Sequence, residues 1–127
     1  RLELVSQGKK VLMVHGSPRR INEYLFEDRP EESVARLFEA ERVDIILCGH
    51  THLLYMRKVG ASLLVNAGSV GKPKDGDPRA GYVLVGIGEE GVKAEIRRVE
   101  YDVEAMVRAI EATELPGEFA MAIREAR

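Results

Sequence analysis

Two short apolar runs, each ending at glycine and histidine, constrain the fold of this chain more than any other feature. The first reads VLMVHG at residues 11–16, and the second reads IILCGHTH at residues 45–52. An apolar run of this length that stops at glycine is typical of a buried strand. The sequence therefore predicts two buried strands, at residues 11–14 and 43–48.

The segment between the two runs carries the pattern of an amphipathic helix at residues 30–41. Pro30 suits the first helical turn, where an amide hydrogen would have no partner, and two glutamates follow it. Three apolar residues share one helical face: Val34, Leu37 and Phe38. A strand, a helix and a second strand in this order predict parallel neighbouring strands joined by a right-handed crossover.

The rest of the chain reads as further strands followed by helices. Residues 53–69 predict two strands joined by a turn at Gly60, and residues 82–101 predict two more with the turn GEEG between them. Asp102 is a suitable cap for a helix at residues 103–112, and a short last helix follows it. The predicted fold is a single mixed α/β domain whose sheet is built mainly from the carboxyl half.

The composition argues against several classes of protein. The 127 residues carry a net charge of −2 with acidic and basic residues interspersed, so there is no basic stripe of the kind that binds nucleic acid. The apolar runs are too short to span a bilayer, and the start does not resemble a signal peptide, so we expect no membrane association. The single cysteine, Cys48, excludes an internal disulfide and fits a small buried hydrophobe in a reducing cytoplasm.

All three histidines lie where the two predicted strands end. His15 follows the first strand, and His50 and His52 follow the second. The carboxyl ends of parallel neighbours meet at one rim of a sheet, so we expect the three imidazoles to converge there. In a locally extended turn, His50 and His52 should point to one side and Thr51 to the other. Neutral imidazole commonly binds divalent transition metals, and three of them favour a metal site over three unrelated half-exposed polar residues.

The loop at residues 68–81 invites two other interpretations. Its stretch GSVGKP is similar to a phosphate-binding loop, but the glycines are too close together and Pro73 stands where serine or threonine is required. Asp75 and Asp77 could be metal ligands, but KDGDP is equally good turn chemistry. We interpret both features as turns.

The histidine motifs and this loop together resemble a known family. VHGSP, CGHTH and NAGSVGKPKDGDPRAGY, between about residues 11 and 82, look like the carboxyl half of calcineurin-like metallophosphoesterases. The resemblance is strongest to the small bacterial and archaeal phosphodiesterase-like members. It implies a four-layer α-β-β-α sandwich with a two-metal site, of which this chain is a part with a mixed sheet and carboxyl-terminal helices.

The resemblance also implies roles for individual residues. His15 and His50 would be ligands of one metal and His52 of the other, with Asn66 and Gly68 in a loop on the substrate side of the site. The cofactors would be two divalent ions, drawn from Mn, Fe, Ni, Co and Zn, and the substrate would be a phosphate ester.

The chain departs from the family pattern in its acidic motifs. The Asp-x-His-Gly, Gly-Asp and Gly-Asn-His-Asp/Glu motifs of the family are absent from these 127 residues, and the chain begins at Arg1 without a methionine. We therefore expect residues 1–127 to be the carboxyl-terminal part of one metallophosphoesterase domain, with the catalytic residues unknown and expected in the amino-terminal half. That half, or a second copy of the chain, is expected to cover an open sheet face.

Two functions from different classes follow. In the first, the chain is half of a metal-dependent phosphoesterase that is inactive alone and hydrolyses phosphodiesters or phosphomonoesters when complete. In the second, it is a non-catalytic three-histidine metal-binding or structural fragment that pairs with another chain. A three-histidine zinc site active by itself ranks below both, because no acidic group supports it.

Overall fold

The larger of two sheets, here called the main sheet, contains five strands in the order β1-β2-β3-β5-β4. The three central strands are parallel, and each outer strand is antiparallel to its neighbour. The computed structural model describes all 127 residues. The strands of the main sheet are β1 (Leu2–Ser6), β2 (Lys9–Met13), β3 (Ile45–Cys48), β4 (Leu54–Val59) and β5 (Ser62–Ala67).

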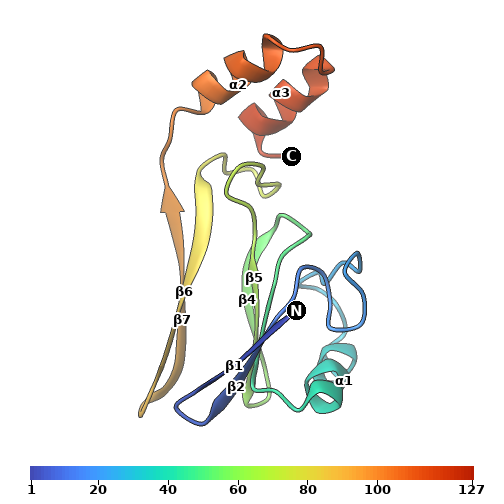
Figure 1. The fold of residues 1–127 in the computed structure, drawn as a ribbon, viewed down its shortest axis with the longest axis vertical. Coiled ribbons are helices and arrows are strands. Elements are labelled where there is room, and N and C mark those ends of the chain that lie inside the picture. The colour runs from blue at the N-terminus through green and yellow to red at the C-terminus, as the bar shows by residue number, and fades with distance from the viewer.

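The predicted strand–helix–strand unit is present. Strands β2 and β3 are parallel neighbours, and α1 (Glu31–Glu41) connects them and lies against one face of the main sheet (Figure 1). The helix starts after Pro30 and ends at Arg42, whose φ of 54° stops it. Three apolar side chains of α1 are buried, as the helical pattern predicts: Val34, Leu37 and Phe38.

The core lies between α1 and the main sheet. Strand β3 is largely buried, because α1 covers one face of the main sheet and a second sheet lies opposite the other face. The core cluster also includes Leu25 from the loop before α1, whose side chain is fully buried. Cys48 belongs to this cluster, and burial raises the pKa of its thiol to about 12, so it behaves as the small buried hydrophobe that the sequence predicts.

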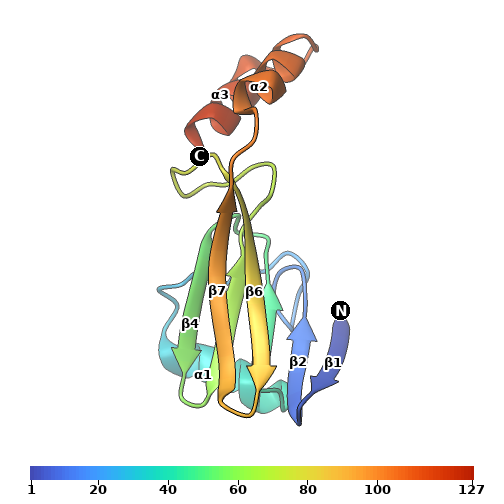
Figure 2. The same cartoon turned by 90° about the vertical axis from the view of Figure 1, so that its left-hand side faces the viewer.

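The second sheet is a two-stranded antiparallel hairpin of β6 (Ala80–Gly88) and β7 (Gly91–Val99). It lies opposite the face of the main sheet that α1 does not cover (Figures 1 and 2). Between the two sheets is a cavity of about 330 Å³ lined mostly by apolar side chains, among them Met13, Leu47, Val65, Val83 and Val85.

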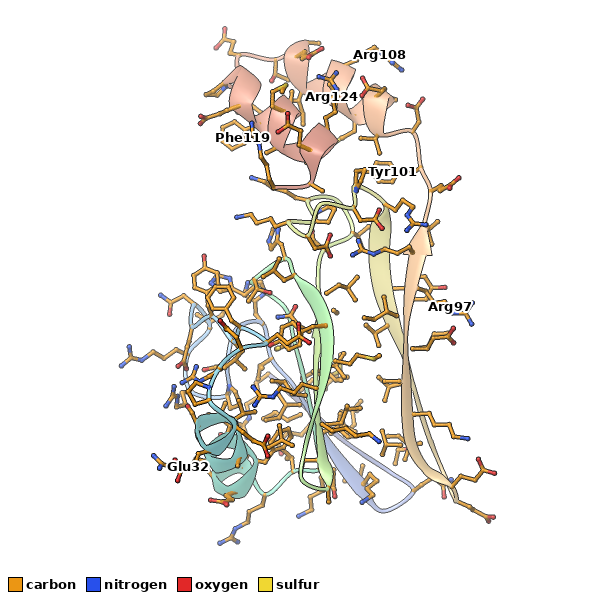
Figure 3. The ribbon with its side chains drawn as sticks, turned by 180° about the vertical axis from the view of Figure 1, so that it is seen from behind. Glu32, Arg97, Tyr101, Arg108, Phe119 and Arg124 are labelled. Carbon is orange, nitrogen blue, oxygen red and sulfur yellow. The ribbon has the colours of Figure 1, made fainter.

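The last two helices, α2 (Val103–Glu111) and α3 (Gly117–Glu125), pack on each other beyond the end of the hairpin (Figures 1 and 2). The side chain of Asp102 accepts a hydrogen bond from the amide of Ala105 at 2.8 Å, which confirms the predicted cap of α2. Arg124 of α3 points toward α2 (Figure 3) and donates to Glu104 at 2.8 Å. These helices do not cover the hairpin, so the chain alone does not show the four layers that the resemblance implies.

The fold class predicted from the sequence is confirmed: a mixed α/β chain with a mixed sheet and carboxyl-terminal helices. The strand β1 was not predicted, because its five residues are all exposed and no buried run marks it. None of the helices is long and apolar enough to cross a membrane.

Candidate metal centre

His15 and His50 meet at the carboxyl ends of β2 and β3. The parallel pairing continues past the strands, because the amide of Gly49 donates to the carbonyl of His15 at 2.8 Å. This bond sets the two turns side by side, and His15 Nε2 lies 3.0 Å from His50 Nδ1. The predicted convergence is therefore present for this pair.

The separation of these two nitrogens suits a shared metal ion. Two imidazole nitrogens that bind one ion at about 2.1 Å lie about 3.0 Å apart in octahedral geometry and about 3.4 Å apart in tetrahedral geometry. The distance between His15 Nε2 and His50 Nδ1 is 3.0 Å. In a hydrogen bond at this distance one nitrogen must give a proton to the other, whereas two neutral rings can both turn lone pairs to one cation. The donor pair therefore fits the metal that the sequence predicts.

The turn that carries the second and third histidines has an unusual backbone. His50 and His52 have φ values of 67° and 62°, in the left-handed region that residues with a side chain seldom adopt. The expectation of a locally extended turn is therefore wrong, and alternation of side chains along a strand does not set where these rings point. Thr51, between them, is buried. Strained backbone of this kind concentrates at functional sites, where surrounding contacts hold it.

His52 faces the loop at residues 68–79. Its Nδ1 lies 2.7 Å from the carbonyl oxygen of Lys72, and the amide of Lys74 donates to the carbonyl of His52 at 3.1 Å. A carbonyl oxygen only accepts hydrogen bonds, so Nδ1 of His52 carries the proton and Nε2 carries the lone pair. A histidine whose other ring nitrogen donates to a backbone carbonyl is the usual arrangement of a metal ligand.

Asn66 holds the histidine turn against strand β5. It is fully buried, and its Nδ2 donates to the carbonyl of Gly49 and to Thr51 Oγ1, each at 2.9 Å. Its Oδ1 accepts from the amide of Gly68 at 3.0 Å. Gly68 has a φ of 65°, and a Cβ there would lie 2.8 Å from the side chain of Leu54. Asn66 and Gly68 thus fix the conformation of the histidine turn from the side of strand β5.

The three imidazoles do not form one compact ligand group. The chain contains no cluster of three or more His, Cys, Asp or Glu side chains that could hold a metal ion. His15 and His50 are in contact, while His52 is hydrogen-bonded to the carbonyl of Lys72. Asp75 and Asp77 are paired with Arg98 and Arg79, which fits the turn interpretation.

Tyr24 is a residue of the site that sequence reasoning missed. Its ring stacks on His50 with centroids 4.3 Å apart and planes 24° apart. Phe26 stacks on Tyr24 in turn, at 5.5 Å and 10°. The sequence shows only three consecutive bulky apolar residues, Tyr24, Leu25 and Phe26, and tertiary contacts decide that Leu25 is the buried one.

Glu23 organises the loop that carries these rings. It accepts hydrogen bonds from the side chains of Arg19, Ser17 and Arg29. The bond from Arg19, with those from Ser17 and Arg29, lowers the pKa of this carboxyl from 4.5 to about 2, although partial burial opposes the shift.

The sequence matches the family model of the calcineurin-like phosphoesterase superfamily domain over residues 1–90. The match covers more than half of the chain, so the chain belongs to this superfamily. An archaeal relative, the uncharacterized protein MJ0912 of Methanocaldococcus jannaschii, is 33% identical over an alignment that covers 87% of this chain and 49% of the relative.

Two solved structures share the fold. The hypothetical protein PH1004 from Pyrococcus horikoshii OT3 superposes with a TM-score of 0.81 at 20% identity, over 96% of this chain and 48% of that one. A metallophosphoesterase from Sphaerobacter thermophilus superposes with a TM-score of 0.71 at 24% identity, over 98% and 57% respectively. The chain therefore spans about half the length of the relatives that it matches.

Replacement of Asn66 by alanine should destabilise the chain by about 2–3 kcal/mol, because the carbonyl of Gly49, the hydroxyl of Thr51 and the amide of Gly68 lose a buried partner. Urea denaturation followed by circular dichroism measures the change. Asn22→Ala, at an exposed position in the loop before α1, is the matched control and should change stability by less than about 0.5 kcal/mol. Equal stability of the two variants would show that Asn66 does not hold the turn.

The Glu23 network should make stability depend on pH. A carboxyl whose pKa falls from 4.5 to about 2 on folding stabilises the native state above pH 4.5, and this contribution disappears as the pH falls through about 2. The difference in unfolding free energy between the wild type and Glu23→Gln should therefore shrink from pH 5 to pH 2. Glu27→Gln, in the same loop but outside the network, should show no such convergence. A constant difference for Glu23→Gln across this range contradicts the assignment.

Proposed function

We propose that this chain supplies the carboxyl half of the metal centre of a phosphoesterase that uses two divalent ions to hydrolyse phosphodiesters or phosphomonoesters. The observation that carries the proposal is the pair of imidazole nitrogens, His15 Nε2 and His50 Nδ1, held 3.0 Å apart at the ends of two parallel strands. Membership of the calcineurin-like phosphoesterase superfamily supports the reaction class.

In this proposal His15 and His50 hold one ion, and His52 holds the other through Nε2. The ions are drawn from Mn, Fe, Ni, Co and Zn, all of which accept imidazole together with carboxylate. When bound, two such ions supply Lewis-acid stabilisation of the phosphoryl oxygens during in-line displacement.

The rest of the machinery of this chain positions the imidazoles. Asn66 fixes the turn between His50 and His52, and the carbonyl of Lys72 keeps the proton of His52 on Nδ1. Gly68 brings the backbone of the substrate-side loop close to Leu54 without a clash. These contacts set the ring orientations before a metal binds, so binding does not have to order the turn.

The charge balance of the centre requires residues beyond these imidazoles. Two neighbouring dications repel, and three neutral imidazoles carry no charge to offset the repulsion. Asp75 and Asp77 are engaged by Arg98 and Arg79, so they do not provide it. We infer that the bridging carboxylate comes from an additional half of the protein. The length of the relatives, about twice that of this chain, agrees with this inference.

The same half, or in its absence a second copy of the chain, is our proposed cover for the apolar cavity between the two sheets. The apolar side chains of that cavity come from both sheets, including Met13, Val65 and Val83. The buried free thiol of Cys48 fits a cytoplasmic protein, and we place the proposed enzyme there.

A second candidate is a non-catalytic three-histidine metal-binding or structural fragment that pairs with another chain. No three His, Cys, Asp or Glu side chains of this chain form a group that could hold a metal ion, which favours the structural form over the metal-binding one. The two candidates differ in whether the complete protein turns over a phosphate ester.

The proposal is tested with bis-p-nitrophenyl phosphate and added Mn²⁺ or Co²⁺. The 127-residue chain should be near background, and a polypeptide that also carries the missing acidic motifs should turn over, with at least a 100-fold loss in His50→Ala. Glu39→Gln, at an exposed position of α1, serves as the control and should retain full rate. Robust turnover by the chain alone, lost in His52→Ala, would show that no other half is needed. A complete protein that binds metal without turnover would favour the second candidate.

The apolar cavity between the two sheets gives a separate prediction for the isolated chain. Because apolar surface left without a cover favours association, the chain should self-associate at micromolar concentration, most simply as a two-fold dimer. Sedimentation velocity measures this. Val83→Lys, which places a charge in the cavity between the sheets, should shift the chain toward monomer, whereas Leu84→Lys, at an exposed position of the same strand, should not. A wild-type monomer that binds no hydrophobic dye would contradict the prediction.

A further inference from the structure

The loop before α1 presents two aromatic rings to solvent beside the candidate metal centre. Tyr24 is 50% exposed and Phe26 is 44% exposed, while Leu25 between them is fully buried. Solvent-exposed aromatic rings lose the free energy that burial would give them, so a pair held in this way at a site needs an explanation.

The two rings are held rigidly. The carbonyl of Leu25 accepts a hydrogen bond from the buried hydroxyl of Tyr55 at 2.6 Å, and the carbonyl of Glu27 accepts one from Arg57 at 2.8 Å. On the other side, Glu23 binds Arg19, Ser17 and Arg29. The loop is thus fixed on both sides of the pair, and the exposure of the rings is built into the fold.

The rings form a row that starts at a candidate metal ligand. His50 stacks on Tyr24, and Tyr24 stacks on Phe26 with the planes of these two rings only 10° apart. A fourth planar group can therefore add to the exposed surface of this row in the same orientation. Base stacking on an aromatic side chain is favourable and tolerates different bases, because every base has a π face.

The residues that precede the row in the same loop are polar and include an unpaired cation. A cavity of about 570 Å³ is lined by Arg19, Arg20, Asn22 and Glu23, and a neighbouring one of about 190 Å³ includes His15 and Arg20. Arg19 is bound to Glu23, but Arg20 has no carboxylate partner. Such a surface differs from the depletion in charge that marks the core of a stable protein interface, and it suits a small anion that carries a planar ring.

We propose that Tyr24 and Phe26 form a stacking platform that selects phosphate esters whose organic group is a planar ring, such as a nucleobase. The phosphate end lies toward His15 and His50, and the ring lies on the aromatic row. This inference rests on the proposed function of the histidines, because they define where the phosphate binds.

The test compares two probes that share a sugar and a phosphate, AMP and ribose 5-phosphate, on the complete Zn²⁺-loaded protein, because the proposed function expects the 127 residues alone to hold metal poorly. AMP should bind about tenfold tighter, a difference that base stacking accounts for. AMP should also shift the ring proton resonances of Tyr24 and Phe26 upfield in NMR spectra. Phe26→Leu should remove most of the advantage of AMP while leaving the binding of ribose 5-phosphate unchanged.

Two further variants separate the platform from other roles. Tyr24→Leu should also remove the advantage, but it disturbs His50 as well, so Phe26→Leu is the cleaner variant. Tyr82→Leu replaces an exposed tyrosine on β6, away from the loop, and should change nothing. Thermal unfolding checks that each variant is folded, and a Phe26→Leu that fails to fold is replaced by Phe26→Met.

The outcomes are distinct from those of the phosphoesterase assay. Equal affinity for AMP and ribose 5-phosphate overturns the platform and leaves the proposed function standing. Failure of the complete protein to bind AMP at all overturns the platform, while the proposed function is judged by turnover of bis-p-nitrophenyl phosphate. A dimer in sedimentation that Phe26→Leu abolishes would assign the rings to a second copy of the chain and would also overturn the platform.

Discussion

The candidate metal centre depends on the parallel pairing of β2 with β3 and on its continuation by one hydrogen bond, from the amide of Gly49 to the carbonyl of His15. Strands paired in register deliver the residues that follow them to the same level of the sheet. Two residues 35 positions apart in sequence therefore bring their ring nitrogens within 3.0 Å. Without that pairing the motifs at residues 15 and 50 would have no geometric relation.

The pairing explains why His15 and His50 meet, but a second interaction explains the turn that follows. A left-handed backbone at both His50 and His52 costs free energy that local sequence does not return. The buried amide of Asn66 offsets it, because its hydrogen bonds to Gly49 and Thr51 are satisfied only in this conformation. The main sheet thus uses one neighbouring parallel strand, β3, to place the histidines and the next, β5, to hold them.

The sequence predicts much of this arrangement, and its failures have physical causes. The periodicity of apolar residues and the glycines and prolines that end each run locate the buried strands and α1. They succeed because buried positions must be apolar. They miss β1, whose residues are all exposed and free of that constraint. They also miss the left-handed turn and the stacking of Tyr24 on His50, since both depend on contacts between segments far apart in sequence. The position of α2 and α3 beyond the hairpin also depends on tertiary contacts. After β7 the chain could fold back over the face of the hairpin or continue past its end, and the local sequence does not distinguish the two.

The charge of the site follows from where its acidic groups are used. Glu23, Asp75 and Asp77 are each paired with arginine, and the arginines hold the pKa of Glu23 and of Asp77 at about 2. The chain therefore presents its imidazoles on a turn that Asn66 holds, while its nearby carboxylates hold the surrounding loops. In the proposed function this chain orients its imidazoles, and a carboxylate from additional residues of the protein compensates the charge of the ions. The chain alone then lacks the charge to bind two dications well, so in this proposal metal binding is coupled to the docking of those residues.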